Sequence, residues 1–579
     1  LYYACQRLYR TDDRGNKWTA VSPDLSRQID PNTLPVFGKI QSIDAVAKNM
    51  STSNYGNIVS LTESPIVEGL IYVGTDDGLI QVTEDGGANW RAIDQITGVP
   101  KMTYVSRLEA SVHDADTVYA TFNNKKNADF KPYVFVSRDR GRTWSSITGD
   151  LPDREIVYSL MQDHVKPGLL FVGTEFGLFF TVDEGTHWIQ LKGGLPTIQV
   201  RDIDIQRTEN DLALATFGRG FYILDDYTAL REVSEQALEQ EAILFPAKDV
   251  LRYVEVEDRV GSRGATFYTA DNPPFGATFT YYLKDGYKTL EDQRIEAEKK
   301  AIKAGEDPKM PTYEELRREE EQLDPEIFFT IRDGSGAVVD RIDGKTKKGM
   351  HRVTWNLRYP SSRPVSLKAG ERPIWGSDPV GPLAMPGTYT VTMSSVLDGA
   401  TTDLGQPQEF EVVDLGINTF AADDPAEVHA FQQKVSDLDR AFRGAVKWAT
   451  DAESRIAHTR KALFDTPGAD TAMLAESQSM QTEIDDIMVE LTGDETRENR
   501  NVFTPPSISE RVNRIVRSQW DATSAPTQTK KDGYEWAAEA FAKELARLKA
   551  LASDLDAFES QLEAAGAPWT PGRLPNWTK

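Results

Sequence analysis

The stretch Ser137-Arg138-Asp139-Arg140-Gly141-Arg142-Thr143-Trp144 belongs to a pattern that occurs four times within residues 1–226. Its first residue is Ser or Thr, and Asp, Gly and Trp follow at the third, fifth and eighth positions. Such an octapeptide predicts a hairpin turn, because the Asp can accept hydrogen bonds from its own turn and the Gly can adopt a positive φ. The Trp supplies a large apolar surface for packing on a neighbouring layer. The Asp, Gly and Trp of the four copies are Asp13, Gly15, Trp18; Asp85, Gly87, Trp90; Asp139, Gly141, Trp144; and Asp183, Gly185, Trp188.

Short strand-like segments precede the later copies. Residues 70–75 and 79–82 stand before the second copy, and residues 169–174 and 178–180 before the fourth. Residues 212–224 repeat this pair of strands without a Trp. Successive copies lie about 45 to 70 residues apart, which fits four-stranded propeller blades of ~40–50 residues with insertions. The sequence therefore predicts a mainly β fold that begins with Asp-box β-propeller blades over residues 1–226.

Only about four and a half blades can be counted, and the first lacks its innermost strand. A closed propeller commonly needs about six to eight blades. We therefore expect an incomplete ring, which a missing N-terminal segment or another chain completes. The opening Leu1-Tyr2-Tyr3-Ala4-Cys5 resembles the middle of a strand and agrees with that expectation.

The remaining sequence predicts further regions of different character. Residues 227–245 are polar and suit a linker, whereas residues 246–414 carry short alternating strands with turn signals, as a β-sandwich does. A charged helical insertion at about 289–324 interrupts that sandwich. Apolar residues at helical spacing then predict an α-helical bundle over 424–566, followed by a C-terminal tail over 567–579.

The composition excludes several classes of protein and of site. Ninety acidic and 65 basic residues give a formal net charge of −25, which argues against nucleic acid as a partner because phosphate contacts need a basic face. A single cysteine excludes an intrachain disulfide framework and Cys-rich metal sites. No apolar run reaches the ~18–20 residues that cross a bilayer, so no transmembrane segment is expected.

The candidate ligand-binding residues lie on the face opposite the Asp boxes. The box aspartates themselves are expected to be structural, because each sits between the third and fourth strands of its blade. The turns between the second and third strands carry Asp76, Asp77, Glu175 and Arg219, and the inserted turn 123–127 is expected on the same face. A ring of such groups suits a ligand, and Arg219 between two glycines could present a fork to a carboxylate.

No catalytic or metal-binding constellation stands out, so the catalytic residues stay unknown. Glycoside hydrolysis generally needs two carboxylates ~5–9.5 Å apart, and the sequence offers no means of choosing a pair. The six histidines are scattered, and no metal ligands or cofactor are expected. Structural calcium at Asp225-Asp226 or Asp423-Asp424 is the alternative, although neither pair has a ligand loop of defined spacing.

The four boxes resemble the Asp-box (BNR) repeats of sialidases, sortilin-type receptors and xyloglucanase-type hydrolases. The whole layout is similar to bacterial secreted BNR-repeat, sortilin-like "glycosyl hydrolase" proteins. Residues 216–226, Thr-Phe-Gly-Arg-Gly-Phe-Tyr-Ile-Leu-Asp-Asp, resemble the segment that closes the propeller part of that group, and residues 566–575 resemble its C-terminus. The phrases 355–358 and 386–389 resemble appended Ig-like domains. The resemblance implies a secreted, periplasmic or cell-surface bacterial protein that is the C-terminal portion of a longer one.

Two functions of different classes remain open. The first is a non-catalytic extracellular or envelope scaffold that engages a protein or glycan through its propeller. It follows from the strong structural repeats and from the lack of a catalytic constellation. The alternative is a glycoside hydrolase of the Asp-box propeller type with its active site at the propeller centre, and it rests on fold analogy alone.

Overall fold

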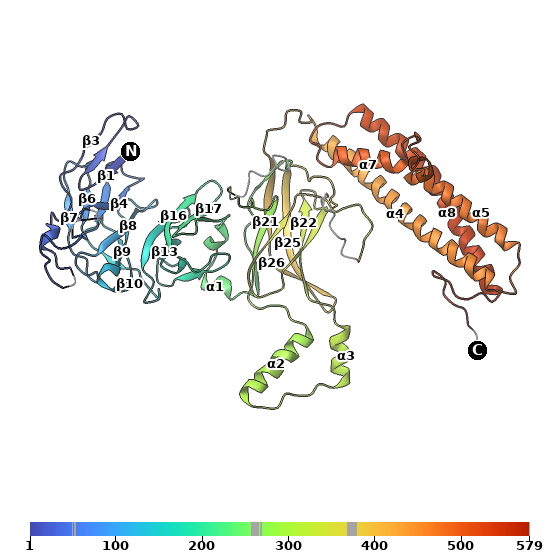
Figure 1. Ribbon diagram of the computed structural model, residues 1–579, viewed down its shortest axis with the longest axis horizontal. Coiled ribbons are helices and arrows are strands. Elements are labelled where there is room, and N and C mark those ends of the chain that lie inside the picture. Colours follow the sequence, from blue (N-terminus) through green and yellow to red (C-terminus); the bar gives the residue numbers. More distant parts are fainter. Residues whose placement is uncertain are drawn as a thin grey trace. The chain divides into compact units, whose positions relative to one another are not determined.

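The computed structural model describes residues 1–36, 38–48, 50, 54–255, 266, 269–367, 379–577 and 579. Parts of the predicted sandwich (256–265, 267–268 and 368–378) and residue 578 of the predicted tail lie outside the described residues. The chain divides into two compact units, residues 1–239 and 240–579, which are described separately (Figure 1). Within this division, the finer boundaries expected from the sequence stay predictions.

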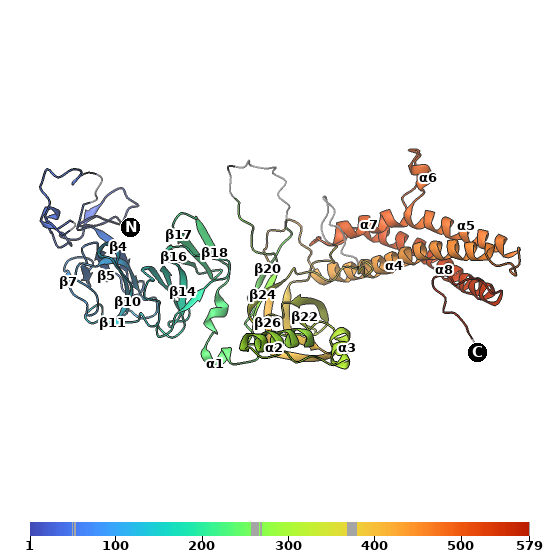
Figure 2. The same cartoon turned by 60° about the horizontal axis from the view of Figure 1, so that its bottom comes forward.

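Unit 1 consists of five small antiparallel sheets that follow one another along the chain (Figures 1 and 2). Each sheet is a meander whose neighbouring strands are consecutive in sequence. The first sheet contains β1 (Tyr2–Ala4), β2 (Leu8–Arg10) and β3 (Thr19–Ala20); the second β4 (Ile58–Glu63), β5 (Ile71–Thr75), β6 (Ile80–Thr83) and β7 (Arg91–Ile93); the third β8 (Tyr104–Ala110), β9 (Val118–Asn124), β10 (Asp129–Ser137) and β11 (Ser145–Ser146); the fourth β12 (Val157–Gln162), β13 (Leu170–Thr174), β14 (Gly177–Thr181) and β15 (Ile189–Leu191); and the fifth β16 (Val200–Gln206), β17 (Asp211–Thr216) and β18 (Phe221–Leu224). The 3-10 turns η1 (Pro31–Thr33), η2 (Lys125–Asn127) and η3 (Thr228–Arg231) and the short α1 (Glu235–Leu238) complete the unit.

The five sheets pack face against face. The first strands of successive sheets lie side by side, β4 against β8, β8 against β12, and β12 against β16. The central strands are buried on both faces, so they read as continuous apolar runs such as Leu170–Val172. Separate apolar clusters fill the spaces between sheets, with Tyr72 and Phe122 between the second and third. This stack of blade-like meanders is propeller-like.

The four octapeptides form the turns between the last two strands of the first four sheets, and all four have one hydrogen-bond pattern. The Ser or Thr hydroxyl donates to Asp Oδ1 at 2.7–2.8 Å and accepts from the Gly N–H at 2.7–3.0 Å. The same Asp oxygen accepts from the backbone N–H four residues onward at 2.8–3.0 Å. At Asp85 this donor, the Asn89 N–H, lowers the carboxyl pKa to about 2.

The later boxes also contact the sheet that precedes their own. A Cβ on Gly87 would lie 2.1 Å from the Val21 oxygen, and one on Gly185 would lie 2.5 Å from the Ile147 oxygen. Both glycines also have positive φ, +104° and +89°. Trp188 Nε1 donates to that same Ile147 oxygen at 3.1 Å. The second and fourth boxes therefore join their own sheets to the outer edge of the preceding one, through contacts that leave no space for a Cβ.

The burial of a box tryptophan also depends on a preceding sheet. Trp188 is 7% exposed against the preceding sheet, whereas Trp18 in the first box is 43% exposed. No described sheet precedes the first one, and Trp18 packs against Tyr3 of its own sheet, with ring centroids 6.1 Å apart.

Unit 2 begins with two sheets and ends in helices. A three-stranded sheet has the order β19-β21-β24, and a five-stranded sheet the order β20-β26-β25-β22-β23. The strands are β19 (Ala242–Leu244), β20 (Val250–Arg252), β21 (Ala277–Leu283), β22 (Glu326–Asp333), β23 (Val338–Gly344), β24 (Gly349–Trp355), β25 (Gly387–Leu397) and β26 (Ala400–Asp414). Both sheets contribute to one core around Phe279, Phe329, Trp355 and Phe410, so they pack face to face. Between β21 and β22 lie α2 (Leu290–Ala304) and α3 (Tyr313–Glu321), bridged by Arg294 and Glu319 at 2.8 Å.

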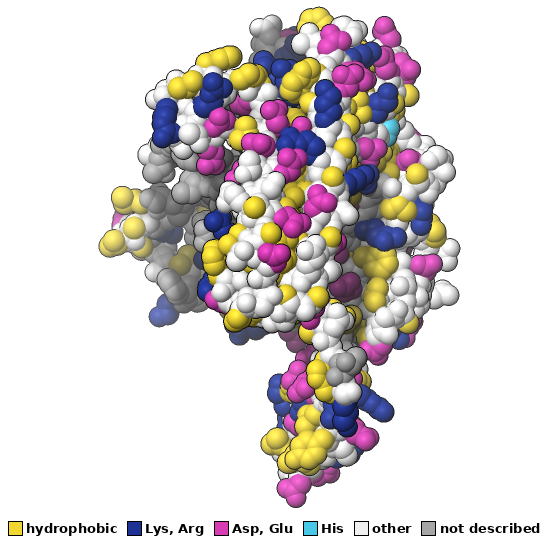
Figure 3. Space-filling model, turned by 90° about the vertical axis from the view of Figure 1, so that its right-hand side faces the viewer, with side chains coloured by type: hydrophobic (Ala, Val, Ile, Leu, Met, Phe, Trp, Pro, Cys, Tyr) yellow, Lys and Arg dark blue, Asp and Glu magenta, His cyan; other side chains and the backbone are white. Residues whose placement is uncertain are grey.

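Four of the C-terminal helices in the described structure share a single apolar core, to which α6 (Glu495–Glu498) contributes no buried residue. The four are α4 (Pro425–Phe464), α5 (Met473–Thr492), α7 (Ile508–Gln519) and α8 (Gln528–Ala564). Phe442 and Phe541 meet in that core with ring centroids 5.8 Å apart. Figure 3 views the molecule from the side on which these helices lie in Figure 1, and charges of both signs are interspersed with apolar side chains there. The prediction of a mainly β chain with C-terminal helices is confirmed.

The box turns should contribute measurably to the stability of unit 1. Asp139→Ala removes the acceptor of the Ser137 hydroxyl and of two backbone N–H groups, those of Arg142 and Thr143. We expect a loss of about 1–3 kcal/mol in the unfolding free energy of unit 1. Pulse hydrogen-exchange mass spectrometry along a urea series would report that unit separately. The matched control is Asp153→Ala, an exposed aspartate whose side chain has no hydrogen bond within the described part of the chain; an equal loss in both variants would contradict the role of the box.

Candidate functional site

The candidate site forms where the first strands of the sheets begin. In the second to fifth sheets, the first strands are β4, β8, β12 and β16. A bulge near the start of each of these strands interrupts its pairing with the second strand. The residues passed over by the register are Val59, Ser106, Tyr158 and Arg201. A bulge bends the strand and re-aims one side chain. The bulges therefore place four different side chains at equivalent points of consecutive sheets, and two of them, Tyr158 and Arg201, are adjacent.

Four side chains from three sheets gather around Tyr158. They are Lys125, Glu175, Gln199 and Arg201, and we call the five residues together the Tyr158 cluster. The Tyr158 hydroxyl donates a short hydrogen bond to Glu175 and accepts one from Lys125 Nζ at 3.3 Å. Lys125 Nζ and Arg201 Cζ lie 4.9 Å and 4.2 Å from the centre of the Tyr158 ring, as in cation–π contacts. Gln199 Nε2 donates to the other Glu175 oxygen at 2.5 Å. Lys126 extends the cluster towards Tyr104, 5.7 Å from its ring.

The electrostatics of the cluster leave positive charge incompletely compensated. Glu175 is its one carboxylate and is already bonded to Tyr158 and Gln199. Burial and the nearby Arg201 lower the pKa of the Lys125 ammonium. Burial and the bond to Glu175 raise the pKa of the Tyr158 phenol, which therefore stays neutral. An anion beside Lys125 and Arg201 would stabilise the charged forms of both side chains.

The four ligand-face candidates occupy different environments. Glu175 belongs to the Tyr158 cluster. Asp76 accepts from the Gly56 and Asn57 N–H groups at 2.8 Å each, and burial raises its carboxyl pKa. Asp77 is fully buried and accepts from the Thr75 hydroxyl and the Arg27 N–H, at 2.5 and 2.8 Å. Arg219 lies in the exposed β17–β18 turn. Of the four, Asp77 is the one whose contacts are most clearly structural.

A second polar group lies along the first strands themselves. Arg107 on β8 forms ion pairs with Glu109 at 3.6 Å and with Asp202 on β16 at 3.2 Å. Burial raises the pKa of the Glu109 carboxyl to about 7, and Arg107 offsets only part of this. A carboxyl with such a pKa can exchange a proton near neutral pH. Neither this group nor Tyr158 was among the residues singled out from the sequence.

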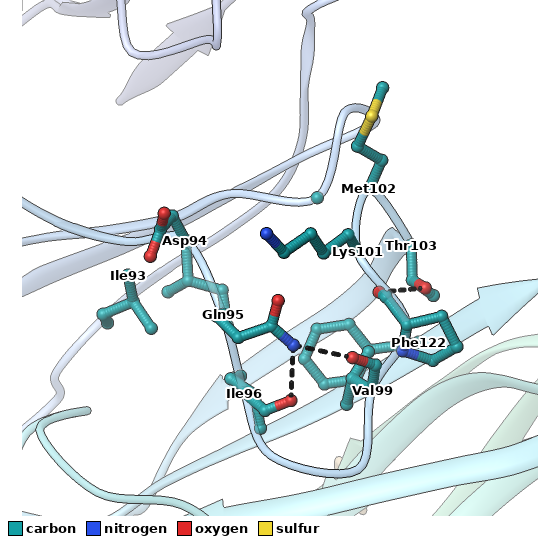
Figure 4. Close-up of a pocket in the computed structure, with 12 residues that line it drawn as sticks. Ile93, Asp94, Gln95, Ile96, Val99, Lys101, Met102, Thr103 and Phe122 are labelled. Carbon is teal, nitrogen blue, oxygen red and sulfur yellow. Dashed lines mark hydrogen bonds between the residues drawn. The ribbon is translucent and has the colours of Figure 1, made fainter.

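The small cavity in Figure 4 is structural. It lies between the second and third sheets, where Gln95 Nε2 donates to the Ile96 and Val99 oxygens at 3.2 and 3.1 Å. Its volume is about 10 Å3, on the order of one water molecule. It is therefore too small for a substrate.

Metal binding finds no structural support. Among the described residues, no three His, Cys, Asp or Glu side chains gather as a metal site requires. Asp226 accepts from Thr228, and Asp424 caps the first turn of α4 by accepting from the Ala426 N–H. The expected lack of a cofactor, and the calcium alternative, stay predictions. None of the described helices combines the length and apolarity that a bilayer-spanning helix needs.

One sequence signal could have located the bulged positions Tyr158 and Arg201, but not the cluster that they join. Each of the four bulges lies in a repeated tetrapeptide of the form apolar, variable, polar, then Leu or Ile. The four copies are Ile58-Val59-Ser60-Leu61, Val105-Ser106-Arg107-Leu108, Val157-Tyr158-Ser159-Leu160 and Val200-Arg201-Asp202-Ile203. The second position changes in chemical character from copy to copy, whereas the first and fourth stay apolar and the third stays polar. Such variation is typical of a position that does not serve the core.

Comparisons with known proteins identify no family. No protein-family model matches the chain, and no curated protein matches it. Among solved structures, the chain is similar to an ancestral GH74 enzyme (11% identity, 71% of this chain and 44% of the other, TM-score 0.28). It is also similar to the GH74 enzyme of Niastella koreensis (15%, 69% and 54%, 0.28) and to YCF48 from Cyanidioschyzon merolae (16%, 29% and 52%, 0.22).

The chain spans about half the length of these structures. Such low TM-scores carry no inference about shared fold or activity. The fold described above rests on the strand pairings of this chain.

The raised pKa of Glu109 makes stability depend on pH. Between its usual value of about 4.5 and its folded value of about 7, the folded protein keeps a proton that the unfolded chain releases, so stability falls as pH rises through this window. Glu109→Gln should therefore match the wild type near pH 4 and exceed its unfolding free energy at pH 8, by up to about 3 kcal/mol. Urea unfolding at both pH values measures this. A difference that stays constant between them would contradict the burial of a titrating Glu109.

Proposed function

We propose that the protein is an extracellular or envelope binding protein that engages an acidic group of a glycan or protein through the Tyr158 cluster. The observation that carries the proposal is the placement of Lys125 and Arg201 on one tyrosine ring, with Glu175 already bonded. Two cations with one shared, occupied carboxylate form a site complementary to an added anion. The Tyr158 ring is itself buried, at 5% exposed, so a ligand would contact the two cations rather than the ring.

A glycoside hydrolase of the Asp-box propeller type is the second candidate. The specific observation in its favour is the hydrogen bond between the Tyr158 hydroxyl and Glu175. In this pairing Glu175 would take the phenol proton while the oxygen attacks, as a tyrosine nucleophile requires. Against it, no second carboxylate lies within the Tyr158 cluster to protonate a leaving group.

We further propose that the five sheets belong to a larger propeller of the BNR, sortilin-like type, completed by another segment or another chain. Apolar side chains at the two ends of the stack support this, since Trp18 is 43% and Phe221 is 80% exposed. Burial against a further blade would remove that apolar surface from water.

Two other elements of the proposal rest on the resemblance noted above. It implies that the two-sheet region of unit 2 is an Ig-like sandwich. It also implies a secreted, periplasmic or cell-surface location in a bacterium.

Binding of a carboxylated ligand should depend on Arg201. On a glycan array that pairs carboxylated sugars with their neutral counterparts, we expect retention of the carboxylated members. For the best of these, Arg201→Ala should raise the Kd by about tenfold or more, because one charge-assisted contact is lost. Lys192→Ala removes an exposed lysine outside the cluster and should leave the Kd unchanged. Equal binding of neutral and carboxylated sugars would contradict the proposal.

The same ligands separate the two candidate functions. A binding protein releases no product from them over long incubation. Turnover that Tyr158→Phe abolishes, while the Kd stays near the wild-type value, would instead establish the hydrolase.

A further inference from the structure

A basic groove lies in the helical part of unit 2, far along the chain from the Tyr158 cluster. It runs between α7 and the first turns of α8 and has a volume of about 960 Å3. Arg511, Arg514, Arg517 and Lys530 line it, together with Ile515 at its apolar floor. Its one acidic residue, Glu510, is engaged in capping α7 by accepting from the Ser507 N–H at 3.0 Å.

The four cations of the groove differ from several others in these helices. Within the described residues none of the four has a carboxylate within 4 Å, although the whole chain carries a net charge of −25. Eight other cations in or just after these helices pair with carboxylates. These pairs are Arg440–Asp437, Arg443–Asp439, Lys447–Asp451, Arg455–Glu559, Lys461–Asp465, Lys531–Glu427, Arg547–Glu483 and Arg573–Glu563. The groove therefore gathers four cations that have no carboxylate partner in the described part of the chain.

Two of these cations are also held in place. The Arg511 guanidinium stacks on Trp536 at 3.7 Å from the ring, and its buried Nε has no hydrogen-bond partner in the described structure. Lys530 Nζ donates to the Ser518 oxygen at 3.0 Å, and burial lowers the pKa of its ammonium. Positioned, partly desolvated cations bind an anion more strongly than mobile surface lysines do, because less side-chain entropy is lost.

We propose that this groove binds an acidic peptide segment of a partner protein. The segment would place Asp or Glu side chains against Arg514 and Arg517 and apolar groups over Ile515. Trp536, which is 43% exposed beside Arg511, favours a protein ligand over a free anion, because exposed tryptophan and arginine side chains anchor protein interfaces. A nucleic acid fits less well, since its phosphates would continue beyond the groove over a chain whose net charge is −25.

The test uses the full chain and fluorescein-labelled hexaglutamate as the probe, followed by fluorescence anisotropy. The groove variant is Arg514→Glu with Arg517→Glu, both exposed residues whose replacement should leave the helices folded. The matched control is Lys543→Glu with Lys549→Glu, the same charge change on the exposed face of α8. We expect the Kd for hexaglutamate to rise at least about tenfold in the groove variant and less than about twofold in the control.

Far-UV circular dichroism verifies that both variants keep their helices, and Arg514→Gln with Arg517→Gln replaces the groove variant if they do not. Equal weakening in groove and control variants would overturn the proposal, because it would reflect net charge alone. Displacement of the probe by inorganic phosphate, at a concentration that supplies the same number of negative charges, would show a site for small anions. That result would also overturn the proposal of a peptide-binding groove. So would tighter binding of duplex DNA, or self-association in sedimentation that the groove variant abolishes.

Discussion

The hydrogen bonds of one aspartate with its own turn are the interaction on which the first unit depends. In each octapeptide the carboxylate accepts hydrogen bonds from a hydroxyl and from the backbone of its own turn. At Gly87 and Gly185 this turn places the glycine where a Cβ would collide with the preceding sheet. There the local turn becomes a contact between sheets, which joins the second sheet to the first and the fourth to the third at their outer edges.

The box turns and the turns at the opposite end of each sheet have different roles, and this difference determines where a binding site can form. The boxes occupy the turns between the last two strands, and their residues are committed to structure. The turns between the second and third strands share no such motif and vary in length and charge, although Asp77 in one of them makes structural contacts. There the bulges at Tyr158 and Arg201, the turn carrying Lys125 and the Glu175 carboxylate meet. Four positions that are equivalent in the four sheets therefore differ in chemistry without cost to the core.

The sequence predicted those features that depend on local spacing. The box turns, the strand pairs and the long C-terminal helices each follow from a pattern within about ten residues. The Tyr158 cluster could not be predicted in this way, because it joins residues 125, 158, 175 and 201 through the stacking of three sheets and through bulges that shift the register by one residue. The turns that carry Glu175 and Asp77 are both predicted from the strand pattern. The sequence does not show that Asp77 is buried by contacts with Arg27.

Lys125 and Arg201 share a site whose positive charge lacks a full partner. The pKa of the Lys125 ammonium, followed by NMR of isotopically labelled lysine in the full chain, measures this directly. We expect a value below the usual 10.5 that rises when Arg201→Gln removes the neighbouring charge, and that also rises when a carboxylated ligand binds the wild type. A Lys125 that titrates at its usual value and does not respond to Arg201→Gln would contradict the shared site.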